Sequence, residues 1–239
     1  MSIDIIIQAR LGSKRLPKKV LMNIGNKTML GQLISRIKKV SKIRKIIIAT
    51  STNKVDDEII SHCEKISNIL TFRGSEKDVL ERYYKTAVKF DSKNIIRVTG
   101  DCPMIDPTII EQIINLFLTN KYDYVSNSLP KTFPDGLDCE IFTFDALKYS
   151  YLNARSNFSR EHVTPFIRGI SNEINKRKFL IGNVSFLKKK KKIRWTVDYE
   201  KDLKRVRKLF ELLPENFSWL DALSAAIEKP KLLGINGQY

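Results

Sequence analysis

The sequence predicts an α/β protein whose mostly parallel sheet is covered by helices on both faces. Short runs rich in isoleucine and valine are typical of buried strands, and they occupy residues 3–8, 45–50, 69–73, 94–98 and 122–126. The longer segments between these runs have helical spacing, with apolar residues on one face over 28–40 and 107–118. Strands and helices that alternate in this way form a parallel sheet between two helical layers.

This alternation ends after residue 127, where a segment with two prolines and a glycine begins. Periodicity then predicts a strand over 139–144, helices near 145–154 and 159–169, strands over 178–186 and 193–197, and helices near 200–213 and 218–228. No linker composition separates the two parts, and no internal repeat is found. We therefore predict a single domain over 1–239 with a small β/α insertion at about 128–192.

Composition limits the classes of protein that the chain can belong to. The chain has 239 residues, 42% of them hydrophobic and 29% charged, as in a folded globular enzyme. No apolar run approaches the roughly 20 residues of a membrane span, and no signal peptide follows Met1. Cys63, Cys102 and Cys139 lack metal-site spacing, so we expect reduced thiols and a cytoplasmic protein.

The formal net charge of +17 leaves two interpretations open. It fits a polyanionic partner, either a phosphorylated metabolite, a nucleic acid or an acidic membrane surface, and it also fits a composition simply rich in lysine. The lysine run in "KKKKKIRW", residues 188–195, is the best evidence for nucleic-acid binding. Aromatic residues are not interleaved with these lysines, and no nucleic-acid-binding motif is present. We interpret the run as a solvated hairpin tip and expect no nucleic-acid or membrane partner.

The loop after the first predicted strand has the composition of an anion site. Ligands of open α/β sheets lie outside the carboxyl ends of the parallel strands, where "ARLGSKRLPKK" begins. Arg10 and Arg15 are suited to bidentate contact with phosphate oxygens, and Lys19 adds a compact charge. The turn at Gly12 and Ser13 offers backbone N–H groups to the same anion. The alternative is a solvated basic loop, since neither G-x-x-x-x-G-K-S/T nor G-x-G-x-x-G occurs.

Two aspartates at other strand ends are candidate metal ligands. Asp101 follows the strand at 94–98, and Asp198 follows the one at 193–197. Carboxylates at such positions suit Mg²⁺ in phosphoryl transfer. The alternatives are a turn-forming role for Asp101 and an N-cap role for Asp198. For Asp106, which precedes Pro107 and a helix, an N-cap role is favoured.

The motifs together resemble the sugar-acid cytidylyltransferases, the family of the CMP-Kdo and CMP-acylneuraminate synthetases. The family's signature loop is matched at Ala9, Arg10, Ser13, Arg15, Leu16, Pro17, Lys19 and Leu21. "GDCPMIDP" is similar to the family's metal loop and "VDYEKDLKRV" to its late segment. The three motifs occur in the family's order and span residues 5 to about 206.

Finer features resemble the branch associated with spore-coat and other surface polysaccharides. These features are "RGSEKDVLERYY", "PDGLDCEIF" and "SREHVTPFIR". Cys102 stands where the Kdo enzymes usually have glutamate, so the resemblance does not extend to Kdo as the substrate.

The resemblance implies a Rossmann-like nucleotidyltransferase fold and a homodimer that uses CTP and Mg²⁺ and releases pyrophosphate. It implies that Arg10, Lys19, Asp101 and Asp198 are catalytic, with Asp101 and Asp198 as metal ligands. The nucleotide would be bound by Ala9, Arg10, Ser13, Arg15, Lys19, Gly74 and Ser75, whereas Lys14 and Lys18 fall at variable positions and are expected to be solvated. The insertion would form dimer and acceptor elements, and the small-molecule acceptor would be bound by Asp135, Asp138, Glu140, Arg160, Glu161 and His162.

Two further alternatives concern the chemistry and one residue. The same fold also serves glycosyltransferases and uridylyl or guanylyl transferases, although the alanine–arginine opening of the loop fits the cytidylyl branch better. His162 is either a base or phosphate ligand, or a histidine packed near a helix start.

Overall fold

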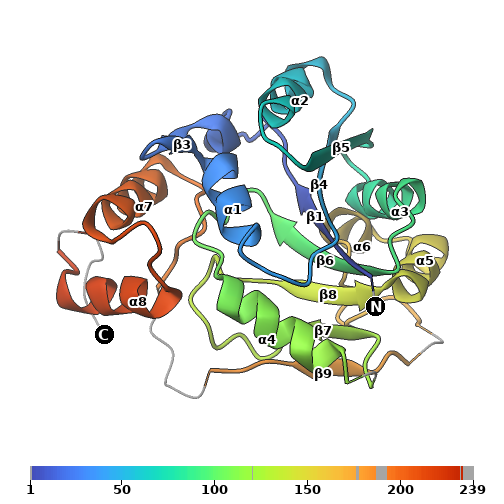
Figure 1. Ribbon diagram of the computed structural model, residues 1–239. Helices are drawn as coiled ribbons and strands as arrows, with labels where there is room; N and C mark the ends of the chain where they lie inside the picture. Colours follow the sequence, from blue (N-terminus) through green and yellow to red (C-terminus); the bar gives the residue numbers. More distant parts are fainter. Residues whose placement is uncertain (1, 120, 176–177, 187–192, 232, 234–239) are drawn as a thin grey trace.

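A seven-stranded mixed sheet forms the centre of the protein in a computed structural model that describes residues 2–119, 121–175, 178–186, 193–231 and 233 (Figure 1). The strands lie in the order β5-β4-β1-β6-β8-β7-β9. All of them run in one direction except β8, which is antiparallel to both of its neighbours. Their bounds are β1 Ile3–Gln8, β4 Lys45–Ser51, β5 Ile69–Gly74, β6 Asn94–Thr99, β7 Tyr124–Ser126, β8 Glu140–Thr143 and β9 Ile181–Asn183.

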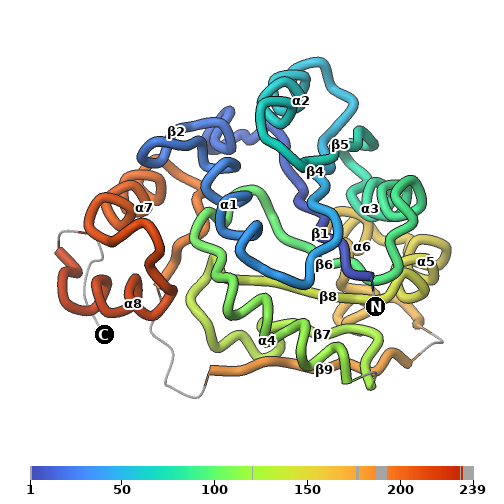
Figure 2. The backbone as a smooth tube through the Cα atoms, viewed as in Figure 1, coloured from blue at the N-terminus to red at the C-terminus, as the bar shows by residue number. Residues whose placement is uncertain are grey.

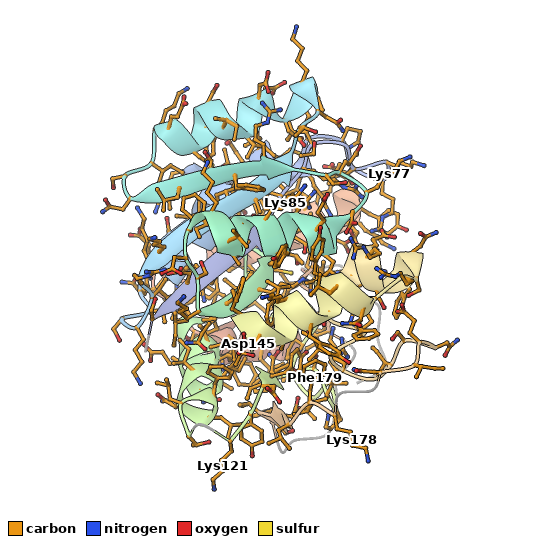
Figure 3. The ribbon with its side chains drawn as sticks, turned by 90° about the vertical axis from the view of Figure 1, so that its right-hand side faces the viewer. Lys77, Lys85, Lys121, Asp145, Lys178 and Phe179 are labelled. Carbon is orange, nitrogen blue, oxygen red and sulfur yellow. The ribbon has the colours of Figure 1, made fainter. Side chains whose placement is uncertain are left out.

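Helices cover both faces because successive side chains of a strand point to opposite sides. Ile5 and Ile7 of β1 belong to one core, and Ile6 belongs to the other. The first core includes α1 (Met29–Ile37), α2 (Asp57–Glu64), α4 (Pro107–Phe117), α7 (Glu200–Leu212) and α8 (Trp219–Glu228). The second includes α3 (Val79–Lys89) and α5 (Phe144–Asn153), which lie side by side in Figure 3, with α6 (Asn157–His162) against α3.

Short elements complete the chain trace in Figure 2. The 3₁₀ turns η1 (Lys19–Leu21) and η2 (Lys54–Asp56) follow β1 and β4, and a small hairpin pairs β2 (Asn23–Ile24) with β3 (Lys27–Thr28). Arg207 of α7 donates to the Asn23 carbonyl at 2.8 Å. This contact joins the C-terminal helices to the hairpin that follows the basic loop.

The structure confirms the predicted α/β class and the mostly parallel sheet, and it corrects three element predictions. The helix predicted near 159–169 ends at His162, because Val163 adopts a φ of 71°. Residues 193–197 are not a strand, since Arg194 makes only an isolated bridge to Asp135. The strand predicted over 178–186 is limited to β9. The lysine run 188–192 lies outside the described residues.

Two expectations from composition can be compared with the structure. Cys63, Cys102 and Cys139 are free and buried, as expected for reduced thiols. Over the ranges given above, no helix has the length and apolar character needed to cross a bilayer.

The carboxyl ends of β1 and β6 meet at one edge of the sheet, where the Gly100 N–H donates to the Gln8 carbonyl at 2.8 Å. Because β8 is antiparallel, its first residue, Glu140, lies at this edge opposite Arg97. The basic loop after β1, the turn after β6 and the segment before β8 therefore converge on a single place.

Candidate active site

A cleft of about 1290 Å³ lies along this edge, and arginines and lysines outnumber acids on its walls. Most of the predicted site residues line it: Ala9, Arg10, Ser13, Arg15, Lys19, Asp101, Asp135, Asp138, Arg160, Glu161, His162 and Asp198. Residues nearly two hundred positions apart in the chain thus share one cavity.

Lys19 occupies the centre of the cleft floor. Its side chain is only 9% exposed, and its ammonium donates to Asp101 Oδ2 at 2.8 Å, Asp198 Oδ1 at 2.9 Å and the Val197 carbonyl at 2.7 Å. An ammonium has three protons, and all three have acceptors here. Lys19 therefore connects the loop after β1 to the two predicted metal ligands.

Asp198 accepts from three cations. Lys19 and Arg15 donate to its Oδ1, Arg15 at 2.7 Å, and Arg194 donates to its Oδ2. Burial opposes ionisation of this carboxyl, but the hydrogen bonds and charges of these cations lower its pKa below the ordinary value. Its N-cap alternative is wrong, because Tyr199 is the N-cap of α7 and Asp202 supplies the capping carboxylate.

Asp101 lies in the turn after β6 and has a carboxylate that is not fully occupied. Its Oδ2 accepts from Lys19, whereas its Oδ1 receives only a weak 3.6 Å contact from the Cys102 thiol. Among the described residues, no cluster of three or more His, Cys, Asp or Glu side chains could hold a metal by itself. The available donors therefore fit Mg²⁺ only in the manner in which it usually binds, through one or two carboxylates plus substrate phosphates.

The loop after β1 is fixed by a buried carboxylate outside its own sequence. Asp56, only 1% exposed, accepts from the Leu11 N–H at 2.7 Å and from the Ser51 hydroxyl at the end of β4. Ser13 caps the following turn by accepting from Leu16 N–H at 3.4 Å. This anchoring fixes the backbone of the basic loop independently of the ion pairs that its side chains make.

All the cations of this loop except Lys18 line the cleft, including Lys14, which was expected to be solvated. Arg10 lies 3.5 Å from Glu76 and Arg15 lies over the Tyr199 ring, both at the cleft wall. Lys18 is exposed and pairs with Glu58 on the outer surface. Lys14 is also exposed, although it borders the cleft mouth.

The segment before β8 contributes a second cluster of charged side chains to the cleft. Lys131 donates to Asp135 at 2.6 Å and to Asp138 at 2.7 Å, and Arg194 lies 3.6 Å from Asp135. Burial opposes ionisation of both carboxyls, yet the cations prevail at Asp135 and lower its pKa. Burial prevails at Asp138 and raises its pKa. The pKa values of Asp135 and Asp138 are therefore shifted in opposite directions, although both carboxyls accept from Lys131.

The segment at α6 contributes Arg160, Glu161 and His162 to the cleft. Arg160 forms a two-pronged pair with Asp78 and also donates to the Tyr151 carbonyl at 2.8 Å. His162 is the last residue of α6, is exposed and contacts the Phe158 ring, so the alternative of a packed histidine at a helix start is wrong.

Three predicted site residues are not on the cleft walls. Glu140 is 5% exposed and accepts from Arg97, Tyr124 and Thr164, so its carboxylate has no room for an acceptor, and the prediction of direct contact is wrong. Gly74 and Ser75 contact Arg82, which lines the cleft, but do not line it themselves. A Cβ on Gly74 would be 3.0 Å from the Arg82 side chain, and the Ser75 carbonyl accepts from Arg82 at 2.6 Å.

Sequence reasoning missed five cleft cations: Lys77, Arg82, Arg97, Lys131 and Arg194. Arg97 had a signal, because an arginine interrupts the apolar run of β6. Arg97 donates to Glu140 at 2.9 Å and to Gln8 at 3.1 Å. Its guanidinium also lies over the ring of Tyr83, a residue of α3. The other four gave no signal, since each occurs in a segment already rich in charge.

A family model described as "Cytidylyltransferase" matches residues 5–227 of the chain. The chain belongs to this cytidylyltransferase family. The match covers the loop after β1, the turn after β6 and Asp198, which are the segments that meet in the cleft.

Relatives of this cytidylyltransferase include an uncharacterised protein of Methanocaldococcus jannaschii, 38% identical over 239 residues (99% of this chain, 95% of the relative). The spore coat polysaccharide biosynthesis protein SpsF of Bacillus subtilis is 32% identical over 216 residues (87% and 86%). A 3-deoxy-manno-octulosonate cytidylyltransferase of Francisella tularensis is 34% identical over 175 residues (71% and 67%). The resemblance inferred from the motifs is thereby confirmed.

The solved structure of a cytidylyltransferase from Leptospira borgpetersenii superposes with a TM-score of 0.92 at 30% sequence identity, covering 100% of this chain and 99% of that one. The nucleotidyltransferase fold implied by the motifs is confirmed over the whole length of the match.

Proposed function

We propose that this cytidylyltransferase transfers CMP from CTP to a sugar acid or a phosphorylated small molecule, releases pyrophosphate, and serves surface polysaccharide or glycoconjugate synthesis. The observation that carries the proposal is the cluster of Arg15, Lys19 and Arg194 around Asp198 and Asp101. Fixed cations beside two carboxylates suit a triphosphate whose charge is also shared with a metal ion.

The proposed reaction is an in-line displacement at the α-phosphorus of CTP. An acceptor oxygen forms the new O–P bond while the bond to the departing pyrophosphate breaks, and no protein nucleophile is required. Arg10, Arg15 and Lys19 offset the negative charge on the phosphates, and the anchored loop holds them in position before substrate binds. Lys131, Arg97 and Arg160 are each paired with a carboxylate, so these side chains would offer the acceptor polar contacts of both signs.

We infer that Mg²⁺ is the cofactor. Asp101 and Asp198 would hold it together with phosphate oxygens, and the bound ion would supply additional charge neutralisation at the triphosphate. The partly free Asp101 carboxylate supports this assignment.

We further propose a cytoplasmic homodimer. Free buried thiols fit a reducing compartment. Large apolar side chains are exposed within the insertion at Leu152, Phe158, Ile170, Ile174 and Leu180, as expected for a surface that a second copy covers. Light scattering after size exclusion will give a mass near twice 27.6 kDa if the chain dimerises.

Pyrophosphate release assayed with each of the four nucleoside triphosphates and a panel of sugar acids and sugar phosphates tests the function. We expect acceptor-dependent turnover with CTP and Mg²⁺. Lys18→Ala serves as a control, because Lys18 is a cation of the same loop that points away from the cleft. Turnover with another nucleotide and none with CTP contradicts the proposal. Release of a nucleoside diphosphate only when a nucleotide-sugar replaces the triphosphate as donor indicates a glycosyltransferase.

A further inference from the structure

Arg82 is a buried cation on the wall of the cleft. It belongs to α3, is only 2% exposed, and lines the same cavity as Arg10. Within the described residues, its guanidinium makes one hydrogen bond, from NH1 to the Ser75 carbonyl, and its Nε is buried without a partner. No carboxylate of those residues lies within ion-pair distance. A charge held away from water without a counterion is costly to a folded protein.

Comparison with Arg36 shows how unusual this is. Arg36, which is 4% exposed, has Asp106 at 3.4 Å and donates to the carbonyls of Ile105 and Phe217. Arg36 is therefore satisfied by the fold itself. Arg82 is not, although it occupies a comparably buried position.

The fold nevertheless holds Arg82 in place. Its aliphatic stem packs against Gly74, where a Cβ would be 3.0 Å from the Arg82 Cγ and from the Phe72 ring. The Ser75 carbonyl fixes one end of the guanidinium at 2.6 Å. The other N–H groups of the guanidinium are therefore held in position, but they have no acceptor among the described residues. This is the state expected of a preorganised ligand contact.

The surroundings favour an anion. Burial lowers the pKa of Arg82, and the nearby positive charge of Arg10 acts in the same direction. The acids in its surroundings are Asp56 and Glu76, but each is engaged elsewhere. Asp56 accepts from Leu11 N–H and Ser51, and Glu76 accepts from Asn53 at 2.6 Å and from Arg10. Two arginines that share one wall and repel each other are both stabilised by an anion between them.

We propose that Arg82 binds the phosphate chain of the nucleotide, together with Arg10 on the same wall of the cleft. This assignment rests on the proposed function. The phosphate chain is favoured over the acceptor because Arg82 lies close to Arg10, which belongs to the loop assigned to the triphosphate. The predicted contribution of Gly74 and Ser75 is then indirect, since they position Arg82.

Steady-state kinetics of Arg82→Met test the assignment. We expect KM for CTP to rise roughly 10- to 100-fold, the range for a lost charged hydrogen bond, while KM for the acceptor changes less than about threefold. Arg82→Lys keeps the charge but not the planar fork and should lie between. The matched control is Lys85→Met on the same helix, whose lysine is exposed, pairs with Glu81 and is labelled in Figure 3.

Thermal unfolding separates a binding role from a structural one. Arg82→Met removes an unpaired buried charge, so the ligand-free variant should unfold at the same temperature as the wild type or higher. The shift that CTP produces in the wild type should be much smaller in the variant. Lys85→Met should leave both temperatures unchanged.

Each other outcome overturns the inference. A ligand-free Arg82→Met protein that unfolds at a lower temperature, with an unchanged KM for CTP, makes Arg82 structural. A rise confined to KM for the acceptor places Arg82 on the acceptor side. If the wild type neither binds nor turns over CTP, the proposed function itself fails, and this is visible before any variant is compared.

Discussion

At the scale of single residues, the protonation of one carboxyl decides how the centre of the cleft is held together. Asp198 has a pKa below the ordinary 3.8, because Lys19, Arg194 and Arg15 overcome the effect of burial. A group with a lowered folded-state pKa stabilises the protein above its unfolded-state pKa, and this stabilisation is lost as pH falls through the folded value.

We therefore expect Asp198→Asn to lower the free energy of unfolding by about 1–3 kcal/mol at neutral pH. The difference from the wild type should stay constant down to about pH 5 and shrink below about pH 4. Urea titrations at several pH values measure it, with Asp57→Asn, an exposed acid paired with Arg73, as the control. A difference that grows on acidification would contradict the assignment.

Residues of this kind were only partly predictable from sequence. Lys19 and Asp101 were placed by motif and by their position after β1 and β6, because the ends of parallel strands converge at one edge of a sheet. Asp198 was placed by motif, since the segment before it is not a strand. Glu140 was misassigned, since the sequence does not reveal that Arg97, Tyr124 and Thr164 already occupy its carboxylate. Arg82 was missed because burial of a charged helical residue depends on how the helix packs.

At the scale of elements, the loop after β1 depends on a residue of a neighbouring segment. Asp56 is the N-cap residue of α2, yet its carboxylate makes no capping bond and instead accepts from Leu11 and Ser51. The helix gives up a capping interaction so that the basic loop is fixed.

Asp56→Ala should therefore lower the free energy of unfolding by about 1–3 kcal/mol, because it leaves three buried donors without this acceptor: the Leu11 N–H, the Ser51 N–H and the Ser51 hydroxyl. It should also raise KM for CTP, since the loop loses its anchor. Asp56→Asn retains one acceptor oxygen and should be intermediate, and Asp57→Ala, an exposed neighbour, is the control. Loss of stability with an unchanged KM would mean that the anchor has no part in binding.

Strands with continuous apolar runs were predicted well, because burial on both faces leaves a clear pattern. Residues 193–197 have the same pattern but do not pair as a strand. The side chains of Trp195 and Val197 are buried, but the segment is a loop beside the turn after β6. There the Val197 N–H donates to the Asp101 carbonyl at 3.0 Å. An apolar run indicates burial, and only the fold decides whether it joins a sheet.

At the scale of the whole molecule, the net charge of +17 and the cleft are separate properties. A basic surface attracts polyanions by counterion release, which weakens steeply with salt, whereas a ligand gripped by buried cations is screened much less.

Fluorescence anisotropy with a labelled DNA duplex, at about 50 and 200 mM salt, distinguishes the two. We expect any duplex binding to fall by orders of magnitude between these concentrations, while the affinity for CTP with Mg²⁺ falls far less. Duplex binding that is sequence-selective and persists at the higher salt would restore a nucleic-acid function.

The reversed direction of β8 has a consequence for how such a protein can diversify. The segment from Asn127 to Cys139 leaves the ligand edge at the end of β7 and returns to it at the start of β8, and the Asn127 side chain ties both Leu137 and Cys139. Its two ends are neighbours, but the segment is also tied to residues outside it, because Asp135 pairs with Arg194, which donates to Asp198. We therefore expect a transplant of this segment between relatives to keep the centre of the cleft intact only if Asp135, or the residue that pairs with Arg194, is preserved.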